Sequence, residues 1–96
     1  MRYFHRTTVP AAEIISEADR HFGRSLETTT RSDRLREYRG TIGTIRIAVK
    51  AEGGHYVHVT AETDQMGESE ADRSAKRFLV LVHKLARPTH EVRGAY

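Results

Sequence analysis

Apolar and polar residues alternate strictly along two neighbouring stretches in the middle of the chain, residues 44–51 and 56–62. Successive side chains of a strand point to opposite faces, so this alternation is typical of strands that are buried on one face only. The apolar positions are Ile45, Ile47 and Val49 in the first stretch and Val57, Val59 and Ala61 in the second. We expect the two stretches to form a hairpin whose apolar positions share one face.

The length of the turn decides which residues of this hairpin face each other. A two-residue loop over 53–54 would set Val49 opposite His58 and would turn one of the apolar sets outward. A three-residue loop over 53–55 sets Val49 opposite Val59 instead, which keeps both apolar sets on one side. The sequence therefore predicts the three-residue loop.

The outer face of the hairpin is polar. The predicted register sets Arg46 opposite Glu62 and Lys50 opposite His58 on that face. Because opposite charges on facing residues attract, we predict an exposed ion pair between Arg46 and Glu62, worth about 0.2–1 kcal/mol.

Apolar residues at helical spacing mark two segments on either side of the hairpin. The first runs from Pro10 to Gly23, because proline suits a first turn and glycine commonly ends a helix. The second begins near Ser69 and Asp72, which resemble a capping box, and Pro88 is expected to end it. The apolar stripe of this second helix consists of Ala71, Ala75, Phe78, Leu79, Val82, Leu85 and Ala86. We expect this helix to be the main cover over the sheet.

Three further strands are expected over residues 2–9, 25–30 and 35–41. The segment 25–30 is rich in threonine and short of apolar residues, which favours an edge strand or an irregular segment. Ile42 is out of phase with the apolar set of the hairpin, and Gly43 follows it, so the sequence predicts a bulge there.

The order of these elements, β-α-β-β-β-β-α, predicts an α+β fold with an antiparallel sheet of four to five strands and both helices packed on one face. This order resembles a reduced helix-grip or TATA-binding-protein-like arrangement, by topology only. We expect residues 1–88 to form a single domain and residues 89–96 to form a mobile C-terminal tail.

Composition narrows the functional classes. The chain has 96 residues, 38% of them hydrophobic, which suits one core and leaves no room for a separate substrate domain. It has no cysteine, which excludes disulfides and thiol chemistry. Residues 1–6 lack the apolar run of a signal peptide and no segment approaches membrane-spanning length, so we expect a cytoplasmic protein without a membrane partner. The net charge of +3 is mildly basic and could favour nucleic acid.

The six histidines invite a metal or acid–base site. His55 and His58 are the only close pair, and residues three apart on a strand point to opposite faces, so we expect no metal site. His83 is the best placed acid–base candidate, but its position beside the apolar stripe is typical of a boundary histidine. No glycine-flanked serine supplies a nucleophile, so we expect no catalytic residue, no cofactor and no enzymatic activity.

The main expectation is a small binding or interaction domain that forms a homodimer through the outer face of the sheet or through an edge strand. That face is polar enough to meet water and also offers charges and an aromatic ring to a second copy. The residues expected at the interface are Arg46, Lys50, Tyr56 and His58.

Two other functions remain open. An apolar small molecule would bind in a cleft between the second helix and the sheet, lined by Ile45, Ile47, Val57, Val59, Phe78 and Val82. Nucleic acid would bind a basic strand that has Tyr38 among its arginines, which are Arg34, Arg36 and Arg39, with Arg46 on the next strand. Asp33 and Glu37 interrupt this basic cluster, which favours an ordinary solvated strand.

Overall fold

The computed structural model describes the backbone of residues 1–94 and the side chains of residues 1–86. Its elements are β1 (Arg2–Thr7), α1 (Ala11–Phe22), β2 (Glu27–Ser32), β3 (Leu35–Gly40), β4 (Gly43–Ala51), β5 (Val57–Thr63) and α2 (Glu70–Gly94). The strands form one antiparallel sheet in the order β1-β5-β4-β3-β2, with β1 and β2 at its edges. The predicted α+β fold and its order of elements are confirmed, with five strands.

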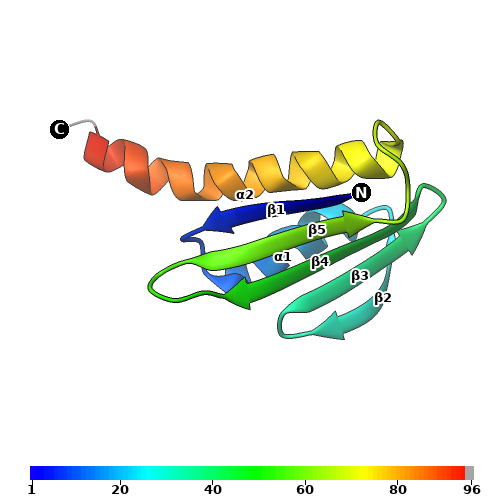
Figure 1. Ribbon diagram of the computed structural model, residues 1–96, viewed down its shortest axis with the longest axis horizontal. Helices are drawn as coiled ribbons and strands as arrows, with labels where there is room; N and C mark the ends of the chain where they lie inside the picture. The colour runs from blue at the N-terminus through cyan, green and yellow to red at the C-terminus, as the bar shows by residue number, and fades with distance from the viewer. Residues whose placement is uncertain (95–96) are drawn as a thin grey trace.

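Both helices pack on the same face of the sheet and against each other. α2 contacts β1, β5 and β4, whereas α1 contacts β4 and β3. Figure 1 shows α2 running alongside β1, with α1 behind the middle of the sheet. The opposite face of the sheet carries neither helix.

The register of the β4–β5 hairpin is the predicted one. Val49 lies opposite Val59, and the backbone N–H of Glu52 donates to the carbonyl of Tyr56 at 2.9 Å, which closes a three-residue loop over 53–55. Both apolar sets therefore reach the core. Arg46 does lie opposite Glu62, but the predicted ion pair between them is wrong.

Glu62 contacts the neighbouring edge strand instead. Its carboxylate lies 3.7 Å from Nε of Arg2, which is its cross-strand partner on β1. Because Glu62 sits on β5, between β1 and β4, it has a basic neighbour on both sides and can turn to either.

One core joins the two helices to the sheet. The ring centre of Phe22 in α1 lies 5.1 Å from that of Tyr38 in β3 and 5.3 Å from that of Phe78 in α2. Such offset aromatic contacts add to the free energy gained from burial. Of the predicted stripe of α2, Ala71, Ala75, Phe78 and Val82 are completely buried, and Leu79, Leu85 and Ala86 are packed against the core.

The predicted start of α2 is confirmed, whereas its predicted end is wrong. At its start the backbone N–H of Asp72 donates to Oγ of Ser69 at 3.1 Å, as the capping pattern predicts. At its end the helix continues through Pro88 to Gly94, so the predicted stop is wrong. A proline removes one N–H donor and tends to bend a helix without having to end it. The mobility predicted for residues 89–96 stays a prediction, and residues 95 and 96 lie outside those described.

The predicted bulge at Gly43 is also wrong. Gly40 pairs with Gly43, so residues 41–42 form a two-residue turn between β3 and β4. The register shift of the sheet lies instead between Thr28 and Thr30, where β2 meets β3. Ile42 is out of phase because it belongs to this turn and not to a strand.

Candidate functional site

The sheet face that is free of helices, here called the open face, carries side chains in three rows across the strands. Because facing residues of antiparallel strands point the same way, the strand registers define these rows. The middle row is Phe4, Thr60, Ala48 and Leu35; a basic row is Arg6, His58 and Lys50; the third row is Arg2, Glu62, Arg46 and Glu37. A mostly apolar strip therefore crosses the sheet between two charged ones.

Two exposed aromatic rings lie on the open face. Phe4 is 60% exposed, and its ring is stacked on that of His58 with the centres 5.2 Å apart. Tyr56 is 48% exposed, and the guanidinium carbon of Arg6 lies 5.5 Å from its ring centre. Exposed aromatic rings beside cations are typical of binding surfaces, because both the ring faces and the charges can take a ligand.

The open face carries five cations, together with the acidic side chains of Glu37 and Glu62. Two of its cations are partly neutralised, since Arg2 pairs with Glu62 and Nε of Arg6 lies 3.0 Å from Glu52. Among residues 1–86, no carboxylate pairs with the remaining three, which are Arg39, Arg46 and Lys50. These three cations are therefore available to an anionic partner.

The four residues predicted for a dimer interface all belong to this surface. Arg46 and Lys50 are exposed on β4, and Lys50 faces His58 across the strand pair. Tyr56 directly precedes β5 and lies beside Arg6. The structure thus brings them together and adds Phe4, which the sequence did not single out because the position of β1 beside β5 was not predicted.

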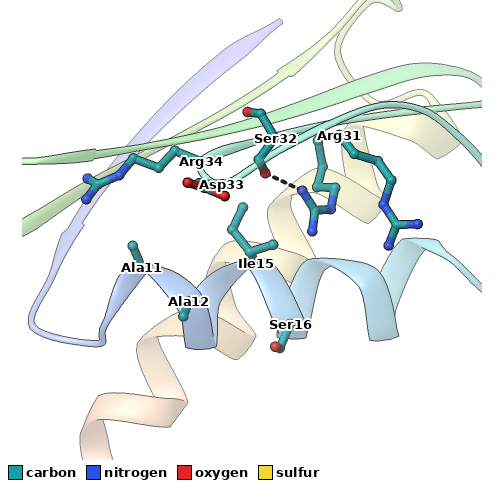
Figure 2. Close-up of a pocket in the computed structure, with 9 residues that line it drawn as sticks. Ala11, Ala12, Ile15, Ser16, Arg31, Ser32, Asp33 and Arg34 are labelled. Carbon is teal, nitrogen blue, oxygen red and sulfur yellow. Dashed lines mark hydrogen bonds between the residues drawn. The ribbon is translucent and has the colours of Figure 1, made fainter.

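The arginines predicted to bind nucleic acid do not form one surface. A groove of about 570 Å³ lies between α1 and the β2–β3 turn. Figure 2 shows that Arg34 of the turn and Arg31 of β2 extend from it in opposite directions. Arg36 points to the helix side, where its Nε donates to Asp19 at 3.1 Å and its Nη1 to the carbonyl of Ser32 at 2.5 Å. Arg39 lies on the open face with Arg46, because residues of opposite parity on a strand face opposite ways.

Tyr38 is part of the core and is not accessible to a ligand. Its side chain is completely buried, and its hydroxyl donates to Oδ1 of Asp19 at 2.8 Å. Burial, and then the Asp19 carboxylate, raise the pKa of the phenol far above its usual range. A ring in this position cannot stack on a base, so Tyr38 serves the core.

The residues predicted to line an apolar cleft form the core itself. Val57 is half-buried, while the other five are completely buried or nearly so: Ile45, Ile47, Val59, Phe78 and Val82. A ligand between α2 and the sheet would have to displace side chains that already pack against each other.

An apolar groove does lie nearby, at the edge of the sheet. It has a volume of about 410 Å³ and is lined by Tyr3, Phe4 and His5 of β1 and by Leu79, Val80 and His83 of α2, with Lys76 at its rim. The sequence did not predict this groove, because it forms between the two ends of the chain.

Two contacts tie β1 to α2 beside this groove. The rings of His5 and His83 meet edge to face with centres 5.8 Å apart, and burial followed by the proximity of His83 lowers the pKa of His5. The buried carboxylate of Asp72 accepts hydrogen bonds from the Tyr3 hydroxyl and, at 3.0 Å, from the Glu68 N–H. The hydrogen bond from Tyr3 is the main reason that the pKa of Asp72 lies below its usual value.

Within the part of the chain that the structure describes, no three histidine or carboxylate side chains gather in a way that could hold a metal ion. In the same residues, no helix combines the length and the apolar character needed to cross a membrane. No model of a known protein family matches the chain, and a comparison with curated proteins finds no relative.

Proposed function

We propose that this protein is a non-enzymatic binding domain that holds single-stranded nucleic acid across its open face. The observation that carries the proposal is the exposed ring of Phe4, which is stacked on His58, has Arg2 and Arg6 on its own strand and shares the open face with Arg46 and Lys50 of β4. Bases stack on exposed aromatic rings, and basic side chains of the same surface follow the phosphate backbone.

Two possible stacking positions support this proposal. Phe4 has the guanidinium of Arg2 5.9 Å from its ring centre, and Tyr56 has that of Arg6 beside it. Lys50 and Arg46 continue the positive surface onto β4. A single strand of nucleic acid that crosses the sheet would meet the rings of Phe4 and Tyr56 near β1, where bases can stack. It would then meet the cations of β4, which can bind its phosphates.

Self-association through the open face is less well supported. Two copies related by a two-fold axis would set the basic row either against itself or against the third row. With the axis over β5, the first case sets Arg6 against Lys50 of the other copy, and with each strand facing its own copy the second case sets Arg6 against Arg2. Like charges oppose each other in these two arrangements, which destabilises the dimers that use them.

The experiment is a fluorescence anisotropy titration of the protein with labelled twelve-residue oligothymidylate and oligouridylate at several salt concentrations. We expect the logarithm of the affinity to fall linearly with the logarithm of the salt concentration, with a slope of about 0.7 per phosphate contacted. Phe4→Ala should weaken binding by at least about fivefold, because stacking contributes about 1–3 kcal/mol per base.

Matched variants separate the open face from the rest of the molecule. Met66→Ala truncates another exposed apolar side chain, and Arg77→Glu changes the net charge as much as Lys50→Glu does. Met66 lies in the loop before α2 and Arg77 lies on α2, so neither control is on the sheet. Binding that is insensitive to salt, or that Phe4→Ala and Lys50→Glu leave unchanged, would contradict the proposal.

A further inference from the structure

We propose that β1 accepts an added strand, namely an extended peptide of a partner protein in which apolar and acidic residues alternate, in the groove between β1 and α2. This inference does not depend on nucleic-acid binding. It rests on the free edge of the sheet, on the lining of the groove and on the charges of β1.

The backbone of β1 has its free hydrogen-bonding groups on the groove side. Met1 and Thr63 exchange both backbone hydrogen bonds, each 2.9 Å long. Because such pairs alternate along an antiparallel ladder, the N–H and C=O groups of Arg2, Phe4 and Arg6 point away from β5. No other strand of the described chain covers this edge, so these groups can pair with a new strand.

The groove lies where the next strand of the sheet would run. It is lined both by Phe4, which points to the open face, and by Tyr3 and His5, which point to the helix side. A hollow that touches side chains from both faces of an edge strand lies beside the strand itself. Figure 1 shows α2 running alongside β1, so a peptide there would lie between the strand and the helix.

The two sides of the groove differ in chemistry, and this difference specifies the peptide. On the helix side an added strand would meet Leu79 and Val80, and Val80 is 51% exposed despite its apolar side chain. On the open side it would lie beside the guanidinium groups of Arg2 and Arg6, which are 61% and 63% exposed although each already has one carboxylate near it, Glu62 and Glu52 respectively. Side chains of a strand alternate between its faces, so the peptide should alternate apolar and acidic residues.

A second copy of this chain fits the edge less well than such a peptide. If two β1 strands paired antiparallel with Phe4 opposite Phe4, then Arg2 of each copy would lie opposite Arg6 of the other. The charges of β1 therefore oppose self-pairing and favour an acidic strand.

The test uses a fluorescein-labelled peptide of seven residues that alternate glutamate and valine, with both ends glutamate. In an antiparallel pair, its glutamates lie opposite Arg2, Phe4 and Arg6, so their N–H groups donate to β1. N-methylation of the glutamates should abolish binding in fluorescence anisotropy, whereas N-methylation of the valines should preserve it. Equal affinity of the two methylated peptides, or no binding of the unmodified peptide at millimolar concentration, would overturn the proposal.

Protein variants and amide exchange locate the peptide. Val80→Glu should weaken binding about tenfold or more, because it places a like charge in the apolar side of the groove. Arg77→Ala changes the net charge by the same amount on the exposed outer side of α2 and should have a much smaller effect. The bound peptide should slow hydrogen exchange at the amides of Arg2, Phe4 and Arg6.

The results also distinguish this proposal from the proposed function and from dimer formation. Val80→Glu should weaken peptide binding more than oligonucleotide binding, because Val80 belongs to α2, and Lys50→Glu should do the reverse, since Lys50 lies on β4. Slow exchange at the same three amides in the protein alone, together with a dimer mass in light scattering, would overturn the peptide proposal in favour of a second copy.

Discussion

Gly43 shows how one residue can decide a turn. Its φ of 123° lies in a region that residues with a side chain rarely adopt, and it begins β4 directly after the two-residue turn. A Cβ atom there would lie 2.7 Å from Cγ of Gln65 and 2.8 Å from Oδ1 of Asp64. The same Asp64 oxygen accepts the backbone N–H of Thr44 at 2.9 Å, so the neighbouring atoms are held in place.

We predict that Gly43→Ala lowers the free energy of unfolding by about 1–3 kcal/mol, because it adds both backbone strain and a collision. Urea denaturation followed by circular dichroism measures this change. Gly53→Ala is the control, since nothing lies within 4 Å of the Cβ atom that it would add. Equal stability of the two variants would show that Gly43 is not constrained in the way described.

At the scale of elements, the packing of β1 against α2 joins the two ends of the chain. The rings of His5 and His83 meet there, and the Tyr3 hydroxyl donates a hydrogen bond to the buried carboxylate of Asp72. Nζ of Lys76 lies 3.2 Å from Oδ2 of the same carboxylate. The pKa of His5 is lowered, so this contact favours the neutral form of the imidazole.

The unfolded chain therefore takes up a proton at His5 at a higher pH than the folded protein does. Starting from the ordinary histidine pKa of about 6.5, the stability contributed by His5 should fall as the pH decreases toward its folded-state pKa. We expect His5→Gln to reduce the loss of stability between pH 7 and pH 5, measured by urea denaturation at each pH. His55→Gln, in the exposed hairpin loop, should leave the slope unchanged; identical slopes for wild type and His5→Gln would refute the assignment.

At the scale of the whole molecule, a single aromatic cluster joins the two helices and the sheet. Phe78 of α2 packs against Phe22 of α1, and Phe22 packs in turn against Tyr38 of the sheet. Phe78→Ala should destabilise the protein by about 3–5 kcal/mol, through lost burial and the cavity that remains. That is a large part of the 5–15 kcal/mol typical of a small domain.

Denaturation of Phe78→Ala beside Val80→Ala provides the measurement. Val80 belongs to the same helix but is 51% exposed, so its truncation should change stability by less than about 0.5 kcal/mol. Similar losses for the two variants would mean that α2 does not depend on its buried stripe.

The hairpin and the helices were predictable because their signals are local. The parity of the apolar residues around the 53–55 loop allows only one register that buries Val49 and Val59 together, and the structure has that register. The start of α2 was predictable in the same way, because Ser69 caps it through an adjacent backbone N–H. Its end was not, because a proline disfavours helix continuation only locally and does not forbid it.

The candidate sites depend on contacts between distant parts of the chain. The position of Phe4 beside His58, and that of His5 beside His83, follow from β1 pairing with β5 and packing against α2. Arg36 bonds to Asp19 because α1 crosses that side of β3.

By itself, the sequence determined the class of fold, the apolar side of the hairpin and of the two helices, and the register of that hairpin, since these depend on periodicity and on turns of a few residues. The threonine-rich composition of β2 favoured an edge strand, but only the tertiary structure decided that β1 forms the other edge and which charged and aromatic side chains share a surface. Those choices depend on the packing of segments that are far apart along the chain, and no local pattern encodes them.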